Sequence, residues 1–162
     1  MTIEVRLPQR IDLDGALRVY DESLDDIRSI LSDVCQALHS QGELIISGFG
    51  DPRWRVDVGT DLLVMLEQLP TAIRNISSGE YAEIELYEQG AERALEFTPA
   101  AGCYLVSCRS WGKWQPDPGT ERIERAELVA MLTAVQDRFM TVVRNSAPQL
   151  AEHPWVVSWL RG

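Results

Sequence analysis

The clearest pattern along the chain is an alternation of apolar and polar residues between positions 82 and 108. Residues 82–88 alternate, Gln89 and Gly90 follow, and residues 91–97 alternate again. Glycine adopts the positive φ angles that tight turns need, so this stretch predicts a β-hairpin with Gln89 and Gly90 as its turn. The register then pairs 88 with 91, 86 with 93, 84 with 95 and 82 with 97.

This register determines which side chains share a face, because successive residues of a strand point to opposite sides. Ile84, Leu95 and Phe97 form the predicted core face. A second turn over Pro99–Gly102, with 97 opposite 104 and 95 opposite 106, adds a third strand. Its apolar residues join the core face: Tyr104, Val106 and Cys108. We therefore expect a three-stranded antiparallel meander.

The opposite face of the meander is acidic. The register sets Glu83 opposite Glu96, with Glu85 next along, and Glu92 opposite Tyr87. Like charges directly opposite each other are unfavourable by roughly a few tenths of a kcal/mol. Two interpretations stay open: a solvated face whose carboxylates hardly interact in water, or an acidic recognition surface.

Longer stretches with apolar residues at helical spacing predict helices near 23–41, 60–77 and 125–144. Ser23 is the expected N-cap of the first helix, and Gly42 ends it. Thr60 can cap the second helix, in which Pro70 predicts a kink or two abutting helices. A short helix is expected over Pro154–Leu160.

Four short stretches predict further strands: Ile3–Leu7, Ala16–Tyr20 after a turn at Asp14–Gly15, Glu43–Ser47, and Trp54–Val58. The last two are expected to pair across a loop rich in glycine. The whole pattern predicts an α+β fold in a single domain, residues 1–162, with an antiparallel sheet packed against about three amphipathic helices.

The segment after Cys108, RSWGKWQPDPGTE, predicts a long loop that carries Trp111 and Trp114. Tryptophan is over-represented at interface hot spots, so the two rings could anchor a partner. The alternative is that they fold back over the core beneath the loop.

Composition narrows the classes of function. The 162 residues include 15 Lys and Arg against 25 Asp and Glu, a formal net charge of −10. This charge repels nucleic-acid phosphates and anionic membranes, so neither is expected as a partner. The start of the chain has no apolar run of signal-peptide length, and no stretch is long enough to span a bilayer, so we expect a cytoplasmic protein.

Three cysteines, Cys35, Cys103 and Cys108, leave at least one thiol unpaired, which fits a reducing compartment. Cys103 and Cys108 lie about 16 Å apart along one predicted strand. A disulfide requires Cα atoms within roughly 7 Å. We expect all three thiols to be reduced and structural.

Motifs for common reactions are missing from the sequence, including GxSxG, HExxH, CxxC, Walker and Rossmann patterns. Gly48-Phe49-Gly50 lacks the ending of a phosphate-binding loop. His39 and His153 each stand without a nearby nucleophile. We therefore expect no catalytic residues, no cofactor and no metal, and a protein that is not an enzyme.

Between Glu43 and Val143 the elements follow in a set order: a strand, a helix through Leu69-Pro70, the hairpin ELYEQGAERALEF, the strand YLVSC and a long closing helix. This order resembles the small acidic immunity proteins of bacterial polymorphic toxin systems. The resemblance implies an intracellular protein that binds and neutralises a cognate toxin domain without catalysis.

Pattern, charge and resemblance lead to one hypothesis and one alternative. The hypothesis is an immunity protein that binds a basic partner, the catalytic domain of a bacterial toxin. Its predicted binding surface consists of Glu83, Glu85, Glu92, Glu96, Trp111 and Trp114. The alternative is a structural or adaptor module that uses the loop of Trp111 and Trp114.

Overall fold

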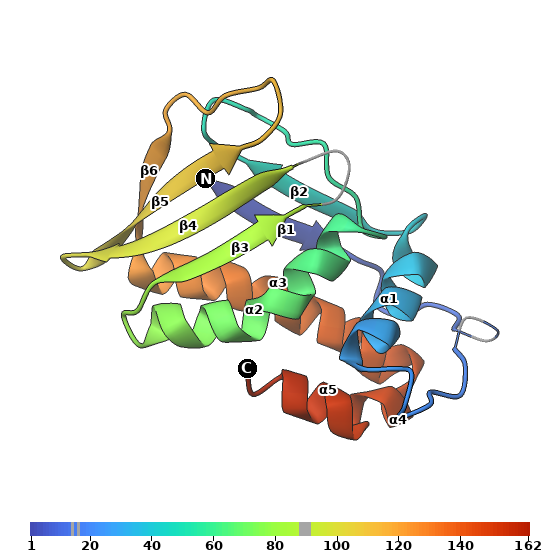
Figure 1. Ribbon diagram of the computed structural model, residues 1–162. Helices are drawn as coiled ribbons and strands as arrows, with labels where there is room; N and C mark the ends of the chain where they lie inside the picture. Colours follow the sequence, from blue (N-terminus) through green and yellow to red (C-terminus); the bar gives the residue numbers. More distant parts are fainter. Residues whose placement is uncertain (14, 16, 88–91) are drawn as a thin grey trace.

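The computed structural model describes residues 1–13, 15, 17–87 and 92–162 (Figure 1). Its strands are β1 (Thr2–Arg6), β2 (Glu43–Ser47), β3 (Ala82–Leu86), β4 (Arg93–Ala100), β5 (Cys103–Ser110) and β6 (Thr120–Glu124). Its helices are α1 (Ile27–Leu38), α2 (Asp61–Ser77), α3 (Arg125–Ser146), α4 (Pro148–Ala151) and α5 (Pro154–Trp159). The predicted α+β class is confirmed.

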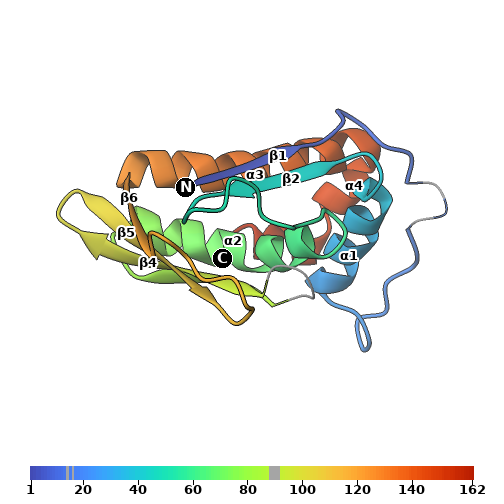
Figure 2. The same ribbon diagram turned by 90° about the horizontal axis from the view of Figure 1, so that it is seen from above.

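The strands form two antiparallel sheets rather than one. β1 pairs with β2, and β3 to β6 pair in chain order as a four-stranded meander. Helix α2 packs against β3 and α3, and α3 packs against β1. In Figure 2 the four-stranded sheet runs along one side of the molecule and α3 along the other, with α2 between them. No helix of the described residues covers the outer face of this sheet, which Figure 1 shows at the front.

The first hairpin follows the predicted register. Ala82 pairs with Phe97 and Ile84 with Leu95, and the ladder continues to residues 86 and 93. The predicted core residues of this hairpin are buried. The predicted turn at Gln89–Gly90, and with it the pair 88 and 91, lies outside the described residues.

The second hairpin differs from its prediction by two residues. Phe97 faces Val106, where Tyr104 was predicted. Strand β4 runs on to Ala100, so the turn consists of residues 101 and 102 alone, and Gly102 has φ 75°. Because side chains alternate with a period of two, this shift leaves each of them on its predicted face. The residues predicted for the core face are accordingly buried: Tyr104, Val106 and Cys108.

Three strand predictions are wrong. β6 (Thr120–Glu124) was not predicted and begins inside the segment 109–121 that was predicted as a loop; with β5 ending at Ser110, the loop is shortened to 111–119. Residues 54–58 form no strand, and the strand that pairs with β2 is β1. The Trp54 side chain is instead buried in the core, and the main-chain N–H of Trp54 donates to the Ile46 carbonyl at 2.8 Å. Residues 17–20 form no strand either, and position 16 is outside the described residues.

Helix α1 begins at Ile27 rather than near 23. Asp26 is its N-cap, and its carboxylate accepts the N–H of Arg28 at 2.9 Å. The hydroxyl of Ser23, the predicted cap, donates instead to Asp21 at 2.6 Å. The preceding turn therefore stays outside the helix.

The other helices match their predicted positions closely. Helix α2 is one element that includes Pro70, so of the two alternatives for this proline, a kink or two abutting helices, the second does not hold. Thr60 is its N-cap residue, but the hydroxyl donates to Asp57 at 2.7 Å rather than capping the helix. Helices α3 and α5 coincide with the predicted stretches to within two residues, and the short α4 was not predicted.

An amide side chain from α2 closes part of the outer edge of the four-stranded sheet. β3 is the first strand of the sheet, and Glu85 turns its backbone groups away from β4. The Gln68 side chain donates to the Glu85 carbonyl and accepts its N–H, both at 2.9 Å. These two hydrogen bonds attach α2 to β3 and satisfy two backbone groups at the edge of the sheet.

Candidate functional site

Three of the predicted glutamates gather around one arginine on the outer face of the four-stranded sheet. Glu83 faces Glu96 across the β3–β4 pair, as predicted, and Arg109 joins them from β5. Arg109 Nη2 lies 2.8 Å from Glu83 Oε1, and Nη1 lies 2.9 Å from Glu96 Oε1. The carboxylate of Glu85 is 3.7 Å from Nη2. We call Glu83, Glu85 and Glu96 the glutamate cluster; one guanidinium bridges it, and its net charge stays negative.

Exposed aromatic and apolar side chains border the glutamate cluster. The Tyr81 hydroxyl donates to Glu83 Oε2 at 3.3 Å. The Trp111 ring, 54% exposed, lies 5.0 Å from the guanidinium carbon of Arg109. Leu105, on the same face of β5, is 41% exposed. Tyrosine, tryptophan and arginine are the residues most enriched at interface hot spots, so this face has the composition of a protein-binding surface.

Glu92 does not lie on this face in the predicted way. The β3–β4 ladder ends at Leu86 and Arg93, so the predicted pair of Glu92 and Tyr87 does not form. Glu92 has φ 43°, outside the range of a strand, and its carbonyl accepts the N–H of Trp111 at 3.1 Å. Glu92 therefore lies outside strand β4.

Trp114 is half-buried and covers the core, which settles the open question for this ring in favour of a lid. The guanidinium carbon of Arg93 lies 3.7 Å from the Trp114 ring centroid and 4.3 Å from that of Trp54. Arg93 Nη2 also pairs with Asp51 Oδ2 at 2.8 Å. Of the two alternatives for the loop tryptophans, Trp114 folds back over the core, whereas the Trp111 ring is exposed.

A polar cavity of about 550 Å³ opens beside the Arg93 side chain. Its charged lining residues are Arg53, Arg55, Arg93 and Lys113, with Asp51 and Glu92. Two loops form its walls and are joined by the Asp117 N–H, which donates to the Phe49 carbonyl at 2.9 Å. Gly50 has φ 82°, and a Cβ atom there would overlap the Asp117 carbonyl oxygen. The close approach of the two loops therefore requires glycine at this position.

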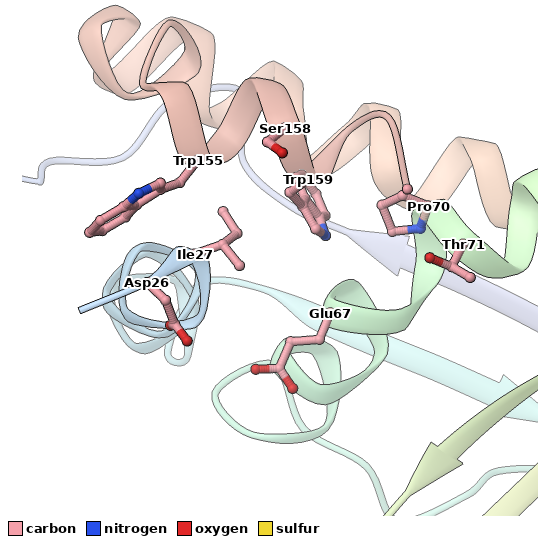
Figure 3. A pocket seen from close by; sticks show the side chains of 9 residues that line it. Asp26, Ile27, Glu67, Pro70, Thr71, Trp155, Ser158 and Trp159 are labelled. Carbon is pink, nitrogen blue, oxygen red and sulfur yellow. The ribbon is translucent and has the colours of Figure 1, made fainter. Parts of the chain in front are cut away.

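A second cavity, of about 380 Å³, lies where α1, α2 and α5 meet (Figure 3). Trp155 and Trp159 form its apolar wall, and the carboxylates of Asp26 and Glu67 lie across from them. Both carboxylates serve the fold, since Asp26 caps α1 and Glu67 accepts from Arg28 at 2.8 Å. Burial raises the pKa of Glu67, and the nearby Arg28 only partly offsets this. We assign this cavity to helix packing.

The three cysteines are free and buried. Among the described residues, no group of three or more His, Cys, Asp or Glu side chains is placed to hold a metal ion. None of the helices in the described ranges is long and apolar enough to cross a bilayer.

Comparison with known proteins gives no relatives. The chain matches no protein-family model, and no curated protein and no solved structure is significantly similar to it. The resemblance to immunity proteins stays a prediction.

Sequence reasoning missed the two arginines that organise these sites. Arg109 belongs to the outer face by simple alternation after buried Cys108, but the predicted register placed it opposite Glu92 rather than Ala94. Arg93 is the first residue of β4 and points to the side of Leu95. No local sequence pattern predicts that Arg93 is buried, because its partners come from loops that are distant in the sequence.

Proposed function

We propose that this protein is a non-catalytic binding protein that captures a basic partner protein through the outer face of its four-stranded sheet. The observation that carries the proposal is the glutamate cluster on a face that no described helix covers, bordered by exposed Trp111 and Tyr81. Such a face combines charge that attracts a cationic partner with aromatic area that a partner can bury.

The electrostatics suit fast capture of a cationic protein. A net charge of −10 attracts such a partner over several ångströms, and acidic fields raise association rates by roughly 10 to 10³-fold. At contact, an incoming lysine or arginine can pair with Glu85, the carboxylate held least closely by Arg109. Burial of the Trp111 ring then slows dissociation, because aromatic anchors carry much of the binding energy of an interface.

The partner that we propose is the toxin domain of a bacterial polymorphic toxin, which this protein neutralises as a cytoplasmic immunity protein. The order of elements from Glu43 to Val143 supports this role, as does the acidic surface. Three buried free thiols are compatible with a reducing compartment.

Protection of a sensitive bacterium tests the immunity role. The protein is co-expressed with the toxin domain encoded beside it, and survival is measured for the wild type, for Glu83→Lys/Glu85→Lys, and for Glu22→Lys/Glu152→Lys. The control variant changes the net charge equally at exposed positions outside the four-stranded sheet, one in the segment before α1 and one at the end of α4. We expect rescue by the wild type and the control but not by the cluster variant. Equal loss of rescue in both variants would contradict a role for this face.

An adaptor module is the second candidate, and the exposure of Trp111 is the observation that favours it. An adaptor would bind its partner without rescuing growth from any neighbouring toxin. Binding that needs Trp111 but tolerates charge reversal at the glutamate cluster would favour the adaptor.

A further inference from the structure

The cavity beside Arg93 concentrates positive charge in a protein that is acidic overall. Four cationic side chains and two anionic ones line it, whereas the whole chain has a net charge of −10. Salt limits the reach of the distant carboxylates, since the Debye length is about 8 Å at physiological ionic strength. A small ligand inside the cavity therefore experiences mainly the charges that line it, and more of these are positive than negative.

Arg93 is the fixed element of this cavity. Its side chain is 9% exposed, and it packs against the rings of Trp54 and Trp114. Asp51 takes one of the two terminal nitrogens, and the other, Nη1, is buried without a hydrogen-bond partner in the described residues. A buried donor of a charged group without an acceptor is unfavourable, so Arg93 is a donor held in place for an acceptor that the described residues do not supply.

The rim of the cavity adds cations that are not neutralised. Arg55 and Lys113 are exposed and form no ion pair with the described residues, while Arg53 pairs with Glu43. Arginine and lysine side chains are the usual ligands of phosphate groups, arginine through its planar fork and lysine as a point charge. The volume of about 550 Å³ falls in the range of small-molecule sites.

We propose that this cavity binds the phosphate group of a small molecule, with Arg93 as the buried donor and Arg55 and Lys113 as cations at the rim. Because Arg93 pairs with Asp51 and Arg53 with Glu43, Arg55 and Lys113 are the lining cations left to neutralise an incoming anion. The proposal goes beyond the proposed function and does not depend on it, because the glutamate cluster lies on a different face.

Binding has an optical signature, because Nη1 is screened from water. An oxyanion reaches this nitrogen only if a group packed on it moves, and the Trp114 ring lies 3.7 Å from the guanidinium carbon. Phosphate binding should therefore change tryptophan fluorescence as well as raise the melting temperature.

The experiment titrates the whole protein with inorganic phosphate to about 10 mM at constant ionic strength, a concentration that saturates a millimolar site. Glycerol 2-phosphate and acetate are titrated in parallel. We expect a saturable fluorescence change with phosphate and none with acetate. Tighter binding of the ester would identify a phosphate monoester as the ligand, and equal binding would identify the free anion.

Variants separate the site from general ion effects. Arg55→Ala and Lys113→Ala, both at exposed positions, should each weaken phosphate binding about tenfold. Arg122→Ala on β6 is the matched control and should leave binding unchanged. The Arg93→Lys variant keeps the positive charge but lacks the planar guanidinium group. It should weaken phosphate binding if the protein stays folded. The proposal is overturned if phosphate gives no saturable change, or if the Arg55→Ala/Lys113→Ala double variant binds like the wild type.

Discussion

The indole N–H of Trp159 donates a hydrogen bond to the main-chain carbonyl of Leu66 at 2.8 Å. In a regular α-helix this carbonyl would accept from residue 70, but Pro70 has no N–H to give. Helix α5 thus satisfies an acceptor that proline leaves free inside α2. The contact explains how α2 keeps a buried proline in the middle of a single helix.

Replacing Trp159 by Phe should lower the free energy of unfolding by about 1–3 kcal/mol, because the Leu66 carbonyl is then buried without a donor. Pro70→Ala returns a helical N–H to this carbonyl, so Trp159→Phe should cost less in that background. Urea unfolding of the wild type, both single variants and the double variant measures the coupling. An equal loss in both backgrounds would mean that the hydrogen bond to Leu66 contributes nothing.

Arg109→Gln should destabilise the protein by up to about 1 kcal/mol, because Glu83, Glu85 and Glu96 then face one another without a bridging cation. The difference from the wild type should shrink in high salt, which screens the remaining repulsion. Thermal melts at low and high salt measure it, with Arg122→Gln as the control. A loss that does not change with salt would point to packing of the Arg109 stem instead.

Charge and aromatic contacts should affect different steps of partner binding. Glu83→Lys/Glu85→Lys should lower the association rate and flatten its salt dependence, since it weakens the acidic field at the contact face. Trp111→Ala should mainly raise the dissociation rate. Surface plasmon resonance with the toxin domain separates the two rates. Trp114→Ala is expected to lower stability instead, because this ring packs on Arg93 and Trp54.

Glu121 should contribute to sensitivity to acid. Burial opposes its ionisation, but bonds from the N-terminal ammonium of Met1 and the N–H of Phe49 outweigh burial and hold the pKa of Glu121 below its usual 4.5. A depressed pKa in the folded state stabilises the protein above pH 4.5, and this stability is lost as the pH falls through the folded pKa. The Glu121→Gln variant should therefore be less stable than the wild type at pH 7, and this difference in stability should shrink in acid. Urea midpoints across this range test the prediction.

The three thiols should be inert in the folded protein. Burial raises the pKa of the Cys108 thiol to about 11 and that of Cys35 further, so few thiolates form at neutral pH. An aromatic disulfide reagent should react slowly with native protein and titrate three thiols in denaturant without reductant. Detection of only one thiol in denaturant would indicate a disulfide and an oxidising compartment.

The first hairpin was predictable because its alternation and register agree, and Ile84 and Leu95 leave one apolar face. The second hairpin misled the prediction because Pro99 is typical of turns, whereas here it lies in β4 beyond the last residue that β3 pairs. Strand β6 was not predicted because Thr120 directly follows a segment rich in proline and glycine, residues that are typical of loops.

The candidate sites were only partly predictable, for a different reason. The opposition of Glu83 and Glu96 follows from local register, and the structure has it. The lid role of Trp114 depends on Arg93 and Trp54, which are remote in sequence, and the cation-lined cavity depends on two loops meeting at Gly50. Contacts of this kind have no periodic signature, so one sequence does not predict them.

The amide of Gln68 has a consequence for assembly. By bonding both backbone groups of Glu85, it occupies the place that a neighbouring strand would take at the margin of β3. A foreign segment seeking to extend the sheet there finds neither an N–H nor a C=O free at this residue. At Glu85, growth of the sheet by strand addition, whether by a partner or by a second molecule, would first require Gln68 of helix α2 to give up these two hydrogen bonds.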